Sequence, residues 1–242
     1  MLRRKINKDE LAKVIQEHLK WLKSNGEFGE KADLSNCDLE RQNLQQANLE
    51  RANLEGVNLC QANLRTTNFT AANLRGAALE GANFQWAIAQ GADLKDACLN
   101  GASLHHASFS GADLSRAQMK GTFSHYTFFN DAILELADLQ GASIRFSEMN
   151  FANLQRVNLS RSIIAASKMI GVDLSGADLS NSIITMSDFE NATLLNSRLH
   201  HSLIIKTSFK KVDFTGTDFN GAKSESADFS ETKFSHESEP VL

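Results

Sequence analysis

Proline is almost missing from this chain of 242 residues, because its one proline, Pro240, lies near the C-terminus. Proline cannot donate a backbone N–H to a sheet ladder, so its absence elsewhere suits a backbone that is hydrogen-bonded almost throughout. Long apolar runs are missing too, since no stretch approaches the ~20 apolar residues of a membrane-spanning helix. We therefore expect no integral membrane segment.

Cysteine is scarce, and we expect no disulfide because Cys37, Cys60 and Cys98 are spaced too far apart. The N-terminus has an amphipathic pattern rather than the charged and apolar regions of a signal peptide. Both observations predict a cytoplasmic protein. Common enzyme motifs are also missing, because the sequence has no Gly-rich phosphate loop, no HExxH and no GxSxG.

A strict period of five residues organises the chain from Ala32 onward without insertion or deletion. Every fifth residue from Leu34 to Phe234 is a central position, and these 41 positions hold Leu, Phe, Ile or Met except at Ala89, Ser124 and Ser224. A period of five matches neither a helix nor a flat strand. It predicts an extended chain that turns a corner after each pentapeptide.

Two further rules hold around each central position. The residue two places before it is small in nearly every repeat, so both residues can fill a narrow interior. The 12 glycines inside the repeats all lie two places after a central position. A corner that needs positive φ selects glycine in this way. The other positions are expected to face water.

These residues resemble the pentapeptide-repeat family, whose consensus A-(D/N)-L-x-x occurs here as ADL at 32–34, ANL at 47–49 and ADL at 177–179. The resemblance covers about 85% of the chain and implies a right-handed, four-sided parallel β-helix with 20 residues per coil. Units of such solenoids bury their apolar faces only by stacking. We predict an all-β solenoid of about ten coils over residues 32–236, roughly 50 Å long at a strand spacing of about 4.8 Å.

Sorting the central positions by 20 residues supports four stacked columns of distinct composition. One column is rich in Phe and Met, another is almost entirely Leu, and a third contains Ile144, Ile164, Ile184 and Ile204 in succession. Stacked aromatic and β-branched side chains suit a ladder in which each lies on its equivalent in the next coil.

Two places break these columns, and we expect the coils there to be the least regular. Ala89 stands in the Phe column, which predicts a small cavity or a neighbouring ring that leans into the gap. The segment 121–130 places Ser124 at a central position with Phe123 and Phe128 immediately beside central positions, which predicts a bulge.

Residues 1–31 predict a capping helix and a linker. Asn7 is a suitable N-cap, Glu10 completes a capping box, and apolar residues recur at helical spacing from Leu11 to Leu22. The apolar stripe of this helix would cover the open first coil and block end-to-end sheet growth. A membrane-surface helix is an alternative, but 8 basic against 5 acidic residues is a small excess. Residues 237–242 are expected to form a tail.

An apolar strip occupies outward positions that are polar elsewhere in the repeats. It follows one edge of the rod and the positions beside that edge, where a terminal segment of the chain could cover it. Contiguous exposed apolar strips usually mark an interface with a protein partner or a second copy, and a homodimer is possible. The candidate residues are Trp86, His106, Phe123, Tyr126, Phe146, Ile163, Ile183, Met186, Leu203 and Ile205.

Acidic residues form two outward columns, and the repeats carry 24 acidic against 17 basic residues. Some members of the resembled family mimic duplex DNA and bind DNA gyrase, which implies an acidic interface as an alternative. However, Asp or Asn is the usual residue before the central position, where it can bond the neighbouring turn. The columns are Asp33, Asp93, Asp113, Asp173 and Asp213, and Asp38, Asp138, Asp178 and Asp218.

Candidate catalytic or metal-binding residues are few. His105 and His125 are predicted to stack beside His106, but no Cys or carboxylate completes a metal site. We expect solvated histidines, no cofactor, no direct nucleic-acid binding and no enzymatic activity. The predicted function is a rigid protein-interaction scaffold that uses the apolar edge. The alternative is a DNA-mimicking gyrase or topoisomerase binder that uses the Asp columns.

Overall fold

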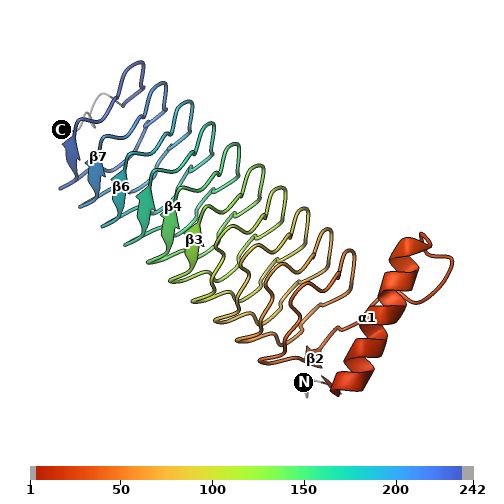
Figure 1. Ribbon diagram of the computed structural model, residues 1–242. Coiled ribbons are helices and arrows are strands. Elements are labelled where there is room, and N and C mark those ends of the chain that lie inside the picture. The colour runs from red at the N-terminus through yellow and green to blue at the C-terminus, as the bar shows by residue number, and fades with distance from the viewer. Residues whose placement is uncertain (1–3, 236–242) are drawn as a thin grey trace.

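The computed structural model of the chain describes residues 4–235, which form a rod with a helix at one end (Figure 1). The predicted tail, residues 237–242, lies outside the described residues. Along the chain the elements are β1 (Arg4–Lys5), α1 (Lys8–Lys23), β2 (Cys37–Asp38), β3 (Phe123–His125), β4 (Ser143–Arg145), β5 (Ile163–Ala165), β6 (Ile183–Thr185), β7 (Leu203–Ile205) and β8 (Lys223–Glu225).

Parallel pairing between residues 20 apart holds the rod together. Strands β3 to β8 form one parallel sheet in chain order. Isolated parallel bridges keep the same register elsewhere, from Asp33 with Asn53 to Asp213 with Lys233. One coil therefore takes 20 residues, as the resemblance implies. The protein is a parallel β-solenoid with one short N-terminal helix.

Each coil turns at four corners, which lie two residues after the central positions. The backbone φ is positive at every fifth residue from Asn36 to Glu231. Glycine occupies some corners, as predicted, but many carry a side chain. Because a left-handed conformation costs roughly 1–2 kcal/mol at a non-glycine residue, the coil imposes the corner geometry on whichever residue stands there.

Backbone hydrogen bonds run along the rod at nearly every repeat. The N–H of Leu54 donates to the carbonyl of Asn73 at 2.7 Å, and the N–H of Asn53 donates to the carbonyl of Ala32 at 2.9 Å. The same pair of bonds recurs in successive coils. This demand on backbone N–H groups explains why proline is missing from the repeats.

The interior contains the central residues and the small residues two places before them. Later coils often carry Ser or Thr instead of Ala at the small position, and several of these buried hydroxyls donate to a carbonyl 23 residues earlier. Thr127 donates to the carbonyl of Leu104 at 2.8 Å, and Ser147 donates to that of Ser124 at 2.6 Å. A backbone acceptor offsets the burial of these two hydroxyls, whereas the buried hydroxyls of Thr122, Ser162 and Ser202 have no hydrogen-bond partner among the described residues.

The expectation of an irregular coil at 121–130 is wrong. Phe123 pairs with Ser143 in the ordinary register, and Tyr126 turns the corner with a φ of 55°, like its neighbours. The buried Ser124 fills less volume than Leu104 and Ile144, its neighbours in the column. The backbone bonds of Phe123 and Tyr126 nevertheless keep the coil in place. Register is set by the backbone ladder and does not depend on one core side chain.

At Ala89, the alternative of a leaning ring is confirmed. Phe84 lies in the neighbouring column, and its ring centroid is 5.9 Å from that of Phe69 and 5.8 Å from that of Phe109. Phe69 and Phe109 lie one coil below and one coil above Ala89. The single Phe84 ring therefore contacts both rings across the gap in the Phe column, which keeps the interior filled.

Helix α1 caps the first coil as predicted. Asn7 Oδ1 accepts a hydrogen bond from the N–H of Glu10 at 2.9 Å. Leu11 and His18 are buried against the coil, and the N–H of Ala32 donates to His18 Nδ1 at 3.1 Å. Strand β1 also pairs in parallel with β2, an addition to the ladder that the sequence did not reveal.

We predict that Phe84 and Ala89 are energetically coupled. Phe84→Ala alone should lower the free energy of unfolding by about 3–5 kcal/mol, and Ala89→Phe alone should lower it by about 1–3 kcal/mol through overpacking. The double variant restores an unbroken Phe column, so its loss should be clearly smaller than the sum. Urea unfolding of the four proteins measures this coupling, and additive losses would contradict the packing described.

His18 should make stability depend on pH. Burial lowers the pKa of His18, so the unfolded chain takes up this proton first. The contribution of His18 is complete above its unfolded pKa of about 6.5 and is lost as the pH falls below that value. His18→Asn keeps an acceptor near the Ala32 N–H without a titrating group. Its free energy of unfolding should fall less than that of the wild type between pH 8 and pH 5, and parallel pH curves would refute this role.

Candidate functional site

One corner of the solenoid carries a row of exposed or half-buried side chains, one from each successive coil. We define the aromatic edge as the corner residues Trp86, His106, Tyr126, Phe146, Ala166 and Met186. Trp86 is 52% exposed, Tyr126 47% and Phe146 51%, as the sequence predicts. No segment among residues 4–235 covers these three rings to the point of burial.

The rings of the aromatic edge are stacked and nearly parallel. The ring centroids of Trp86 and His106 are 3.9 Å apart with an angle of 1° between the planes. His106 and Tyr126 are 5.0 Å apart at 1°, and Tyr126 and Phe146 are 5.0 Å apart at 10°. The spacing follows the strand spacing of the coils. The fold therefore places four rings in one continuous stack.

Every member of the stack has a left-handed backbone, with φ between 53° at Phe146 and 62° at Trp86. Bulky residues are unusual in this conformation. Ring stacking contributes about 0.5–1.5 kcal/mol per pair, which offsets a cost of roughly 1–2 kcal/mol per residue. Stability alone therefore gives little reason to place rings here instead of glycine or asparagine.

Beside the aromatic edge lies the outer surface of strands β3 to β7. We define the sheet face as Phe123, Ile163, Ile183, Leu203 and Ile205. Phe123, Ile183 and Leu203 are exposed, whereas Ile163 and Ile205 are half-buried. Phe123 pairs with Ser143, and Ile163 pairs with Ile183 in the parallel ladder. The sheet face and the aromatic edge are adjacent, because each three-residue strand runs directly into its corner.

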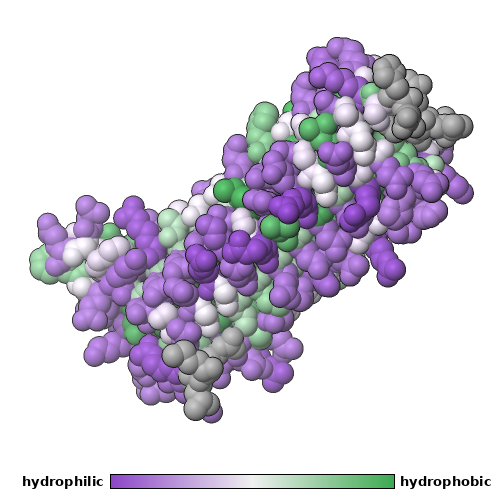
Figure 2. Space-filling view, turned by 180° about the vertical axis from the view of Figure 1, so that it is seen from behind, coloured by the Kyte–Doolittle hydropathy of each residue, from purple (hydrophilic) through white to green (hydrophobic). Residues whose placement is uncertain are grey.

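The apolar surface also extends to the other side of the corner, which the sequence analysis missed. Ile88 and Phe128 follow Trp86 and Tyr126 by two residues, and both are exposed. Their signal was present, because each replaces a polar residue immediately before a central position. Ile133, Leu136 and Phe151 are also exposed but lie at other faces and corners. Figure 2 shows the rear of the rod, where hydrophilic side chains dominate and hydrophobic ones form small groups.

Histidines line the N-terminal part of this surface. The ring centroids of His105 and His125 are 4.7 Å apart, and His125 Nε2 is 3.0 Å from Ser143 Oγ. Partial burial lowers the pKa of both rings, and the charge of a neighbouring histidine lowers it further. Both rings are therefore neutral at pH 7. Within residues 4–235, no three His, Cys, Asp or Glu side chains come together as a metal site.

The Asp columns mainly hold turns and ion pairs. Asp33 Oδ1 accepts from the N–H of Ser35 at 3.0 Å, and hydrogen bonds from Ser35 lower the pKa of Asp33. Asp213 accepts from the hydroxyl of Thr215 at 2.7 Å, which lowers its pKa in the same way. These bonds confirm the expected structural use of Asp before the central position.

Several of these acids also face a basic side chain. The closest pairs are Lys95 Nζ with Asp113 at 2.9 Å, Lys120 Nζ with Asp138 at 3.1 Å, Arg198 with Asp178 at 3.1 Å and Lys233 Nζ with Asp213 at 3.8 Å. Asp38 accepts from Asn58 at 2.7 Å, Asp173 from Gln155, and Asp218 lies 3.8 Å from His200. Asp93 accepts a hydrogen bond from the N–H of Lys95. The negative charge of the two columns is therefore partly neutralised.

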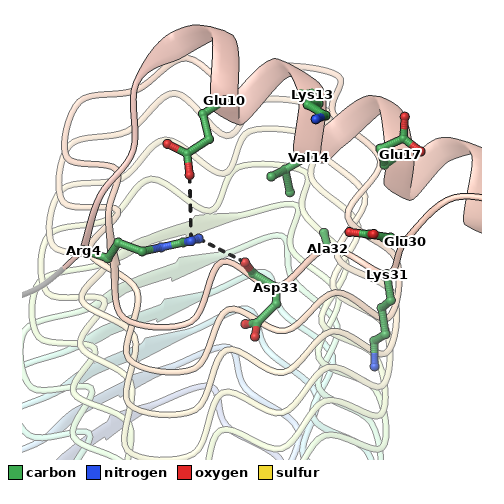
Figure 3. Close-up of a pocket in the computed structure, with 9 residues that line it drawn as sticks. All are labelled: Arg4, Glu10, Lys13, Val14, Glu17, Glu30, Lys31, Ala32 and Asp33. Atoms are coloured by element: carbon green, nitrogen blue, oxygen red, sulfur yellow. Dashed lines mark hydrogen bonds and ion pairs between the residues drawn. The ribbon is translucent and has the colours of Figure 1, made fainter.

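A cleft of about 330 Å³ lies between helix α1 and the first coil (Figure 3). Glu10 points toward Arg4, whose Nη1 is 3.8 Å from Glu10 Oε1, and Arg4 Nη2 donates to the carbonyl of Asp33 at 3.4 Å. Val14 and Ala32 are the apolar residues among those that line it. The cleft is a junction between cap and coil with mixed charge, and no residue of the aromatic edge lines it.

The regular 20-residue register, the four corners and the stacked columns define a repeat protein of the parallel β-solenoid class. The family model for pentapeptide repeats matches residues 32–70, 47–85, 90–123, 128–163, 164–196 and 207–236. These matches cover well over half of the chain, and the protein belongs to the pentapeptide-repeat family. A search of curated proteins gave no significant match.

Solved structures of other pentapeptide-repeat proteins are similar to this chain. HetL from the cyanobacterium Nostoc, which is involved in the regulation of heterocyst differentiation, aligns with a TM-score of 0.50 at 22% identity over 94% of this chain and 96% of its own. This likeness supports the fold alone.

Two further structures align with a TM-score of only 0.35, and no conclusion about this protein is drawn from them. A protein of the Arabidopsis thaliana thylakoid lumen aligns at 33% identity over 36% of this chain and 60% of its own. QnrB1, a plasmid-mediated fluoroquinolone resistance protein, aligns at 18% identity over 80% of this chain and 89% of its own.

We predict that an inner ring of the stack contributes more stability than an end ring. Tyr126 stacks on two rings, whereas Phe146 stacks on Tyr126 alone. Replacing either residue by glycine relieves the same corner strain, so the difference isolates one stack. Tyr126→Gly should lower the free energy of unfolding by about 0.5–1.5 kcal/mol more than Phe146→Gly. Urea unfolding measures both, and equal losses would mean that the rings do not stack.

Proposed function

We propose that this protein is a non-enzymatic interaction scaffold that binds a protein partner through the aromatic edge and the sheet face. The observation that carries the proposal is the row of half-exposed stacked rings at strained corners. Large exposed apolar strips are typical of interfaces, and Trp and Tyr are favoured as binding anchors. A rigid stack also loses little side-chain entropy when a partner docks on it.

The surroundings of the strip suit a protein partner. The strands β4 to β7, which carry most of the sheet face, contain one charged residue, Arg145, and no acid. Partial burial lowers the pKa of the adjoining His105 and His125, which favours their neutral form at pH 7. Interfaces have cores with few charged residues and polar rims, and this surface has that composition. The cytoplasmic location expected from the sequence stays a prediction.

The alternative, a gyrase binder that uses the Asp columns, has weaker support. A DNA mimic needs carboxylates that are free to meet basic residues of its target. Here Asp113, Asp138 and Asp178 pair with basic side chains of this chain, and other acids hold turns. The proposal therefore assigns partner binding to the apolar surface.

A charge placed on the aromatic edge should abolish partner binding. Immobilised wild-type protein is compared with Tyr126→Glu and with the control Leu136→Glu, which alters a corner residue of similar exposure on another face. Proteins retained from the source cells, including further copies of this chain, are quantified at 50 and 500 mM salt. A partner of this surface should be retained by wild type and by Leu136→Glu at both salt concentrations, and lost with Tyr126→Glu.

Two outcomes would overturn the proposal. Identical retained proteins for wild type and Tyr126→Glu would exclude the aromatic edge as the interface. Retention that falls steeply with salt and survives Tyr126→Glu would favour the Asp columns, because charge-driven binding is screened by salt.

A further inference from the structure

The ring stack ends at Phe146, and a single small residue separates it from Met186, the last member of the aromatic edge. Successive coils place Trp86, His106, Tyr126 and Phe146 in line, and the next coil places Ala166 at the same corner. The coil after that places Met186 there. A row of large side chains therefore contains one position that has only a methyl group.

The backbone keeps the normal spacing across this position. The N–H groups of Phe146, Ala166 and Met186 each donate to a carbonyl of the next coil at 2.9 Å. The backbones of Phe146 and Met186 are consequently held two strand spacings apart, roughly 10 Å. Within the stack, the ring centroids of Tyr126 and Phe146 are 5.0 Å apart. The space above Ala166 thus has the thickness of one aromatic ring.

Exposure of the flanking side chains agrees with an open gap. Met186 is 59% exposed, more than any ring of the stack. Phe146 is covered by Tyr126 on one side, and only Ala166 stands on the other. Trp86 to Phe146 fill their corners with rings at the same backbone angles, so the coil geometry itself accommodates a ring at this position.

The groups that flank the gap are mainly apolar, although Arg145 and Thr185 pair with Ala165 on either side in the parallel ladder. Phe146 supplies the face of a ring, and the thioether of Met186 makes favourable contacts with aromatic rings. Ala165 is buried beneath the corner, and Ile163 and Ile183 adjoin it on the sheet face. The ion pair between Lys168 and Glu148, 3.1 Å apart, lies just past the corner. An apolar planar group fits the gap, and a polar rim surrounds it.

We propose that this gap receives an aromatic side chain, Trp, Tyr or Phe, of the protein partner, which completes the stack between Phe146 and Met186. The inference rests on the proposed function, because it names the anchor that the partner inserts. The gap is open toward solvent, unlike the concave sites that enclose small molecules. An aromatic side chain of the partner can stack in the gap while the partner's backbone rests on the sheet face.

The test uses N-acetyltryptophanamide as the probe and the methyl resonances of the methionines as the readout. Met119, Met149 and Met169 are fully buried and serve as internal references. Millimolar probe should shift the Met186 methyl resonance through the ring current and leave the three buried methyl groups unchanged. No shift at Met186, or equal shifts at all four, would overturn the proposal.

Filling the gap provides the matched variant. Ala166→Phe should remove the probe-induced shift of Met186, whereas Ala71→Phe should preserve it. Ala71 is an alanine at another corner with a similar φ, 54° against 50°. Both variants place Phe in a strained conformation, but only Phe at position 166 has a ring to stack on. Ala166→Phe should therefore melt at a higher temperature than Ala71→Phe, and the reverse order would count against the gap.

The two proposals can fail separately. Loss of the partner with Tyr126→Glu, together with no probe effect at Met186, would retain the interface and remove the anchor site. A probe effect at Met186 that Ala166→Phe abolishes, together with partner retention that Tyr126→Glu does not change, would retain the gap as a ring-binding feature and remove its role in the partner interface.

Discussion

Parallel backbone pairing between residues 20 apart is the constraint on which the rest of this protein depends. It holds successive coils at one spacing and places every side chain over its equivalent in the next coil. Inside, this arrangement requires columns of compatible shape. Outside, it turns any repeated surface residue into a row, so the Asp columns and the aromatic edge follow from the same constraint. At the corners it imposes positive φ regardless of the residue present.

Surface side chains of the solenoid divide into those that hold turns and those that do not. Asp33 and its equivalents accept hydrogen bonds from the N–H two residues on, so their repetition has a structural reason. The rings at Trp86, Tyr126 and Phe146 hold no turn and stand where glycine or asparagine would cost less. Stacking offsets part of that cost. Their exposure is therefore the feature of the surface that the fold leaves without a structural explanation.

Much of the fold could be predicted from the sequence, because the period of five, the small residue and the corner glycine each have one geometric meaning. The coil at Ser124 was predicted wrongly, since side-chain volume says little about a register that the backbone fixes. Pairing of β1 with β2 involves two residues and leaves no pattern. The exposed edge was predicted, but its parallel rings and the gap at Ala166 depend on side-chain orientation. Ile88 and Phe128 were missed because only the positions on one side of the corner were included in the predicted strip.

Photocrosslinking in the source cells tests the central claim, that the aromatic edge is the partner interface. A photoreactive phenylalanine replaces either Phe146 or Phe151, which is 67% exposed and has a similar left-handed φ on another corner. The account predicts one discrete crosslinked product from position 146 and none from position 151. The same products at both positions, or none at position 146, would contradict it.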